Sequence, residues 1–169
     1  MYEGVYRPKG WLRIEPYAEK RFLNSFYYFG LGALDESEGV VPLDGPLRIR
    51  PGAVEAVYSD ERFDMSGRVL GIIGNISTVL HRGLELLASP SIDPGFGGNL
   101  QVQLKNNGPD TVSLSPGALL GKCIFFDVSE SDLDTSEFVG SKLKESELAR
   151  RDEARGIIDR AASNDDGAE

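Results

Sequence analysis

The chain has 169 residues, of which 40% are hydrophobic, and this is enough apolar material for one globular domain with a core. It contains one cysteine and one histidine, which excludes a disulfide framework within the chain and a zinc site built from His and Cys side chains. The formal net charge is −9 and no stretch reaches roughly 20 consecutive apolar residues, so neither duplex nucleic acid nor a membrane is an expected partner.

The N-terminal residues and the cysteine predict a compartment. MYEGVYRPKGWLRIEP lacks the apolar centre of a secretion signal, and Cys123 stands alone within the apolar run KCIFF. We therefore expect a soluble protein of the cytoplasm.

Residues 14–32 form the first predicted unit along the chain. They combine a polar stretch, YAEKRFLNS, with an aromatic run, FYYFGLG. The polar stretch is compatible with one or two helical turns, and the aromatic run predicts a strand or turn beneath a barrel.

From residue 47 to residue 128 the chain reads as short strands separated by turn signals. The predicted strands are LRIR, AVEAVYS, RVLGII, NLQVQLKN, TVSLS and CIFFDV, and the breaks fall at Pro51-Gly52, Asp60-Glu61, Gly74, Gly108-Pro109 and Pro116-Gly117. In NLQVQL the alternation places Leu100, Val102 and Leu104 on one face and Asn99, Gln101 and Gln103 on the other. The pattern predicts an all-β barrel or sandwich.

The composition changes after Asp127. Residues 129–169 hold 12 acidic and 6 basic residues, a net charge of −6, which leaves −3 for residues 1–128. Ser146 is a good helix N-cap, and a thin apolar stripe follows it at Leu148, Ala154, Ile157, Ile158, Ala161 and Ala162. We expect a β domain over residues 1–128 and an acidic tail over residues 129–169, with a short helix around residues 146–162 between disordered ends.

Several stretches resemble one known family. LRIRPGAVEAVYSDERFDMSGRVLGIIGNISTVLHRGL is similar to its strand, Pro-Gly turn and G-R-S-S phosphate loop, IDPGFGG to its third motif, and SPGALLGKCIFF to the P-G-x-x-I-G-Q-L-x-F segment that follows. NSFYYFGLG is similar, more faintly, to the N-terminal S-Y-D-L-R-L-G. The family is the trimeric dUTPase and dCTP deaminase superfamily, and the D-P-G-aromatic-x-G form of the third motif belongs to the deaminase branch. The resemblance covers about residues 14–128 and implies a jelly-roll-like β-barrel and a homotrimer with nucleotide sites shared between subunits.

In this resemblance the bend at Asp93-Pro94-Gly95 lies against a deoxyribose. Gly95 lacks the Cβ that would block the sugar, Phe96 offers it a flat face, and Asp93 lies at the floor of the pocket. A simpler reading stays open, in which Pro-Gly-Phe-Gly-Gly is a hairpin connection with an aromatic plug.

The family's phosphate loop surrounds a triphosphate with one arginine and two hydroxyls. Here the arginine position falls on Ile76 or Asn75, so its charge is missing, while Ser77 and Thr78 keep the hydroxyls. Arg82 is a candidate replacement cation and is equally well read as an ordinary surface charge. His81 is read as an exposed or interface loop residue rather than a ligand.

The resemblance also shows which catalytic groups are missing. The glutamate that activates water in the deaminase branch corresponds to Gln103, whose amide cannot accept a proton at neutral pH. The pyrophosphatase branch orients water through the motif-three aspartate, kept as Asp93, while Mg²⁺ held by the triphosphate spreads charge. The C-terminal arm of that branch has no match after Val128. The aspartate of S-Y-D-L-R-L-G is replaced by Tyr27, and the glutamine after I-G falls on Lys122.

We therefore expect a homotrimer of nucleotide metabolism that is catalytically weakened or silent, with no cofactor bound by its own side chains. It binds a pyrimidine deoxynucleotide, another small ligand or a protein partner at the acidic tail, and the predicted nucleotide-binding residues are Ser77, Thr78, Arg82, Gly95, Phe96 and Gln103. The alternative is an active dUTP pyrophosphatase, with Asp93 as catalytic residue and a cation from Arg82 or a neighbouring subunit. A third reading is an assembly scaffold with residues 146–162 as a docking helix, for which a frayed end is the simpler explanation.

Overall fold

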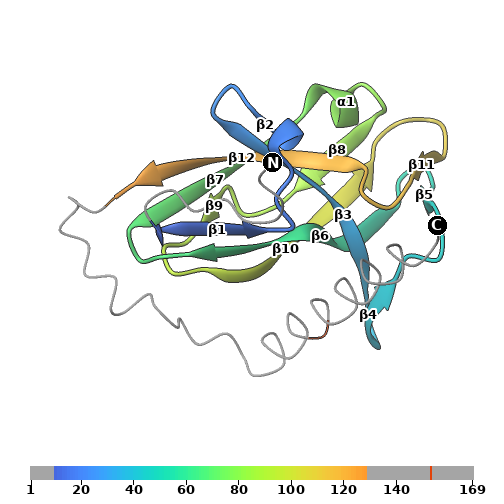
Figure 1. Cartoon of the computed structure of the whole chain (residues 1–169). Helices are drawn as coiled ribbons and strands as arrows, with labels where there is room; N and C mark the ends of the chain where they lie inside the picture. Colours follow the sequence, from blue (N-terminus) through green and yellow to red (C-terminus); the bar gives the residue numbers. More distant parts are fainter. Residues whose placement is uncertain (1–9, 129–152, 154–169) are drawn as a thin grey trace, which may run out of the picture.

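The computed structural model describes residues 10–128 and Glu153. In this part of the chain the helical elements besides the single residues Gly10 and Glu153 are a 3-10 turn, η2 (Glu19–Arg21), and a four-residue helix, α1 (Ser77–Leu80). The strands labelled in Figure 1 are β1 (Leu12–Glu15), β2 (Phe22–Leu23), β3 (Phe26–Glu36), β4 (Gly39–Pro42), β5 (Leu47–Ile49), β6 (Val54–Met65), β7 (Val69–Asn75), β8 (Leu84–Leu87), β9 (Ser91–Ile92), β10 (Gly97–Asn106), β11 (Val112–Leu114) and β12 (Leu119–Asp127). The predicted all-β class is confirmed. The predicted tail helix lies outside the described residues except for Glu153, which is helical.

Ten of these strands form one antiparallel sheet that curls into a half barrel (Figure 1). The order of hydrogen-bonded neighbours is β8-β10-β6-β3-β12-β7-β9, with β1 beside β6 and with β2 and β4 beside β3. The remaining two, β5 and β11, form a small sheet of their own.

The curled sheet has two arms, β8-β10-β6 and β12-β7-β9. Strand β3 connects them because it changes partners along its length. Residues 27–30 pair with β12, and residues 31–34 pair with β6. The change falls at Gly30 and Gly32, and a Cβ at Gly32 would stand only 2.8 Å from the Ser59 carbonyl oxygen. Glycine therefore permits the close approach of β3 to β6. The aromatic run FYYFGLG forms a strand, as one of the predicted possibilities, but it lies in the middle of the sheet and not beneath the barrel.

Strand β6 continues through the predicted break at Asp60-Glu61, which corrects a second prediction. Alternate residues of the segment 57–65 face inward, and Glu61 on this face is fully buried. Its carboxylate accepts a hydrogen bond from the Arg21 guanidinium and another from the Gly30 backbone N–H at 2.9 Å. Because these donors compensate the buried charge, the strand continues where an acidic pair predicted a turn.

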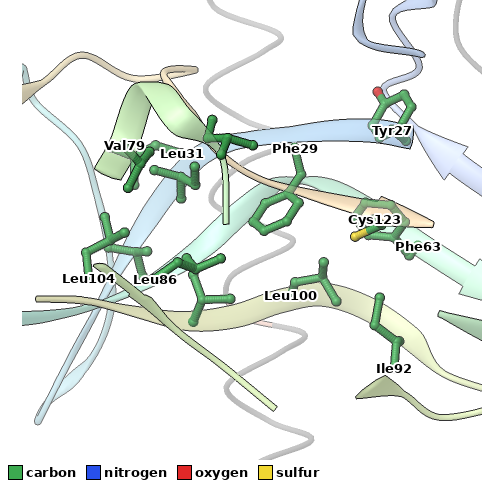
Figure 2. Packing of buried hydrophobic residues seen from close by; sticks show 14 of the residues in the cluster. Tyr27, Phe29, Leu31, Phe63, Val79, Leu86, Ile92, Leu100, Leu104 and Cys123 are labelled. Atoms are coloured by element: carbon green, nitrogen blue, oxygen red, sulfur yellow. The ribbon is translucent and has the colours of Figure 1, made fainter. Parts of the chain in front are cut away.

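The hydrophobic core fills the space between the two arms of the sheet. Figure 2 shows Phe29 of β3 pointing towards Leu100 of β10, with Leu86 and Leu104 next to each other further along the core. All four side chains are less than 7% exposed. Burial of each large apolar side chain contributes about 1.5–3 kcal/mol to folding.

The alternation predicted in NLQVQL holds, but Asn99 on its polar face is buried. Gln101 and Gln103 are exposed, as predicted, whereas Asn99 is buried beside Leu100. Asn99 pairs with Arg62 on the face opposite Leu100, next to the point where the pairing of β10 with β6 shifts register, between Asn99 and Gln101. There its Nδ2 donates to the Ser59 carbonyl oxygen at 2.9 Å.

Within residues 10–128, no helix has the length and apolar character needed to cross a membrane.

Candidate functional site

The predicted bend is a tight turn between β9 and β10. The Phe96 N–H donates to the Asp93 carbonyl oxygen at 3.1 Å, and Gly95 between them has a φ of +83°, which favours glycine. The Gly95 N–H donates to the Ser66 carbonyl oxygen at 3.1 Å, and this ties the turn to the β6–β7 connection. Phe96 packs half-buried against the core, whereas the Asp93 side chain is exposed. The turn therefore presents a carboxylate on a fixed backbone.

Gln103 lies at a separate cavity on the outer face of the sheet. It pairs with Leu87 of β8 on one side and with Ala56 of β6 on the other. The cavity measures about 400 Å³ and is lined by Leu87, Ala88, Gln101, Val102 and Gln103. A glutamine side chain offers a hydrogen-bond donor and an acceptor without charge. The cavity can therefore recognise the polar edge of a neutral heterocycle, but Gln103 cannot act there as a general base.

A neighbouring contact holds one side of this cavity in place. The Gln101 side chain donates to the Asp35 carboxylate of β3, reaching across the intervening strand β6. Its rotamer is therefore set by the sheet rather than by a ligand.

The hydroxyl residues of the predicted phosphate loop lie on α1. Ser77 and Thr78 are its first two residues and both are exposed. Ile76, just before them, is 5% exposed and belongs to the core, and the Asn75 Oδ1 accepts a hydrogen bond from the Leu86 N–H at 3.0 Å. Of the two candidate positions for the missing arginine, Ile76 therefore packs in the core, and the exposed Asn75 bonds to the backbone of β8.

Arg82 has a partner within its own chain. Its Nη2 donates to the Ser113 carbonyl oxygen of β11 at 2.6 Å, and His81 beside it is exposed. This bond uses one of the five N–H donors of the guanidinium and directs the side chain towards β11.

Strand β10 separates the three groups of predicted residues. The Asp93 turn precedes its first residue, the Gln103 cavity lies in its second half, and the connection after α1 meets its far end, where Leu84 pairs with Asn106. A strand of this length spans roughly 30 Å. Asp93, Ser77 and Thr78 accordingly do not line the Gln103 cavity within one chain.

Sequence reasoning missed the buried polar residues that position these parts. Asn106, fully buried, donates through Nδ2 to the carbonyl oxygens of Ile49 at 2.9 Å and Asp110 at 2.8 Å, and its Oδ1 accepts from the Gly108 N–H at 2.9 Å. Asn106 lies two residues after Leu104 and so continues the buried face of Leu100, Val102 and Leu104. This period-two spacing is the signal that would have identified it. The same period-two spacing of buried residues in β6 identifies Glu61.

Burial raises the pKa of several ionisable groups outside the cavity. For Asp60, burial raises the carboxyl pKa while the nearby Arg21 guanidinium opposes the shift. For Tyr27 and Cys123, burial likewise raises the pKa, so the Cys123 thiol is protonated and unreactive at neutral pH. No group of three or more His, Cys, Asp or Glu residues that could hold a metal ion occurs among the described residues.

Some known proteins are similar to this chain in sequence. No protein-family model matches the chain. A dCTP deaminase of Buchnera aphidicola subsp. Baizongia pistaciae (strain Bp) is 29% identical over 87 residues, which are 51% of this chain and 45% of that protein. A dCTP deaminase of Marinomonas sp. (strain MWYL1) is 29% identical over 97 residues, 56% of this chain and 50% of that protein. The chain thus spans about half the length of the curated relatives it matches.

Solved structures share the fold. A 2'-deoxycytidine 5'-triphosphate deaminase from Agrobacterium tumefaciens matches with a TM-score of 0.55 and 13% identity, over 64% of this chain and 41% of that chain. A dUTPase from phage phi11 of S. aureus matches with a TM-score of 0.53 and 14% identity, over 73% of this chain and 94% of that chain. These matches define a dUTPase-like fold. Together with the sequence similarity to dCTP deaminases, they confirm the resemblance of the chain to the dUTPase and dCTP deaminase superfamily.

Proposed function

We propose that the protein is a dUTPase- and dCTP deaminase-like homotrimer of the cytoplasm that binds a pyrimidine deoxynucleotide or a related small ligand and turns it over weakly or not at all. The cavity beside Gln103 carries this proposal. It is formed by the strand that follows the D-P-G-F turn, and it presents amide groups where the deaminase branch of the family needs a carboxylate.

The surroundings of the predicted phosphate loop, at Ser77 and Thr78, support weak turnover. Ile76, one of the two positions at which the family's arginine is missing, is packed in the core, and the Arg82 guanidinium donates to the Ser113 carbonyl oxygen. Charge-assisted donors to phosphate are among the strongest stabilising groups in phosphoryl chemistry. We infer that a ligand is held mainly through its base and sugar.

Self-association is part of this proposal because one chain does not gather the predicted groups. The turn, the cavity and α1 are spread along β10, and only neighbouring subunits can bring them together. Apolar side chains at the surface, among them Phe22, Leu23, Leu119 and Phe126, favour burial against other subunits.

Calorimetric titration with dUTP, dCTP and their mono- and diphosphates tests the proposal. We expect one of these nucleotides to bind and the Ala88→Trp variant to bind it at least about 30-fold more weakly, because the indole fills the cavity. Thr111→Trp is the matched control, since Thr111 is also exposed but does not line the cavity. If no nucleotide binds, or if Ala88→Trp binds like the control, the proposed site is refuted.

The same samples test the proposed loss of catalysis. We expect no ammonia release from dCTP, because residue 103 is an amide. Rapid deamination by the unmodified protein would show that another residue serves as the base.

Asp93 supports the alternative of an active dUTP pyrophosphatase, because its carboxylate is exposed on a rigid turn and is available to water. On this alternative, dUTP with Mg²⁺ gives pyrophosphate, and Asp93→Asn lowers the rate by about 10²-fold or more. Absence of pyrophosphate release from the unmodified protein rejects it.

A further inference from the structure

A second apolar cluster lies outside the main core. Ala33 of β3, Val40 of β4 and Tyr58 of β6 form it, with exposed fractions of 0%, 5% and 1%. Tyr58 pairs with Ala33 on one side and with Gln101 on the other, and directly paired residues of antiparallel strands share one face of a sheet. Because Gln101 is exposed, this is the outer face. The cluster is therefore buried on the side of the sheet that faces away from the core.

Glu153 indicates which segment covers this face. It is helical, and a Cβ added at Gly39 would stand 3.1 Å from its Oε1 and 3.2 Å from its Oε2. Gly39 is the first residue of β4 and directly precedes Val40. The Glu153 carboxylate thus lies at the edge of the cluster.

We propose that residues 146–162 dock as a helix on the outer face of β3, β4 and β6 of their own chain. Ile157 follows Glu153 by four residues, so in a helix it lies on the same side one turn further along. A helix of this length extends roughly 25 Å, which is enough to cross three strands spaced about 4.8 Å apart. The stripe of Leu148, Ala154, Ile157, Ile158, Ala161 and Ala162 supplies the apolar side chains that cover the cluster.

The connection is long enough for the segment to dock within its own chain. Seventeen residues separate Val128 from Ser146, and a chain of this length reaches up to roughly 60 Å. This exceeds the length of any strand in the domain, so the segment can reach the face without exchange between subunits.

Chemical modification of Tyr58 in the full-length chain tests this docking. Ile157 and Ile158 are both changed to Asp, and nitration by tetranitromethane is followed for each tyrosine by peptide mass. We expect Tyr58 to react at least about tenfold faster than in the parent protein, because the apolar cover is lost. The control changes Ser163 and Asn164 to Asp, which adds the same charge outside the stripe, and it should react like the parent.

The fully buried Tyr27 of the main core is the internal reference, because it reacts faster only if the whole domain opens. Unchanged reactivity of Tyr58 in the Ile157→Asp, Ile158→Asp variant would overturn the proposal. Protection of Tyr58 that disappears on dilution of the parent protein would assign the cover to a second copy and would equally overturn docking within one chain.

A double-mutant cycle tests independently whether the segment contacts the cluster. Val40→Ala and Ile158→Ala should change the unfolding equilibrium constant non-additively, with at least about a threefold departure from the product of the single effects. The matched cycle pairs Ile158→Ala with Val112→Ala in the main core and should be additive within about twofold. Additivity in both cycles contradicts contact between the segment and the cluster.

Discussion

Replacing Arg21 by methionine is expected to lower the free energy of unfolding by about 3–5 kcal/mol. Arg21 donates to the fully buried Glu61 carboxylate and lies 3.5 Å from Asp60. Methionine keeps much of the side-chain length but removes the charge, so Glu61 is left in the barrel without its cation. Chemical denaturation followed by Trp11 fluorescence, Trp11 being the only tryptophan of the chain, measures the loss.

Two further variants show whether charge pairing is the cause. Adding Glu61→Gln to Arg21→Met should recover part of the lost stability, because no uncompensated charge remains. Arg13→Met is the matched control, because Arg13 pairs with Glu15 at 2.5 Å where both side chains are about 40% exposed. It should cost less than about 1 kcal/mol. Equal losses of unfolding free energy in Arg21→Met and Arg13→Met would show that the buried Arg21–Glu61 pair stabilises the protein no more than the exposed pair does.

Replacing Asn106 by leucine is expected to cost about 3 kcal/mol or more. The substitution removes three hydrogen bonds and leaves the Ile49 carbonyl and the Gly108 N–H without their partner, at about 1–3 kcal/mol for each unpaired buried group. These bonds join β10 to β5 and to the turn that leads to β11. Thermal unfolding measures the effect.

The neighbouring Asn107 provides the comparison for Asn106. It is exposed, and its side chain bonds only to Glu85, at 2.9 Å, among the described residues. Asn107→Leu should therefore change stability by less than about 0.5 kcal/mol. If the two variants unfold at the same temperature, the buried network does not secure the end of the barrel.

Much of the fold was predictable because β structure follows from local patterns. Gly and Pro turn signals and period-two alternation located the strands that the structure shows as β5, β7, β10, β11 and β12. The candidate site was predictable only in part. The D-P-G-F turn follows from the conformations that Pro94 and Gly95 favour, but the cavity beside Gln103 depends on β8, a four-residue strand, LELL, too short to show a period-two pattern clearly.

The failures of prediction have a common physical origin. An acidic pair predicted a turn within β6, yet Arg21, forty residues away in sequence, compensates Glu61 and the strand continues. Asn99 lies on the polar face as predicted, yet it is buried there and bonded to the Ser59 carbonyl oxygen of β6. In both cases a partner from a distant part of the chain decided the local structure.

The sequence alone determined the all-β class, the family resemblance, and the absence of an arginine and a glutamate at the positions where the family acts, because these are properties of residue type and spacing. Only the tertiary structure decided that Ile76 is a core residue, that Arg82 is bonded to Ser113, and that Asp93, Gln103 and Ser77 lie apart along β10. Such distances depend on which strands pair and in which register, and strand pairing joins residues whose separation along the chain leaves no local signal.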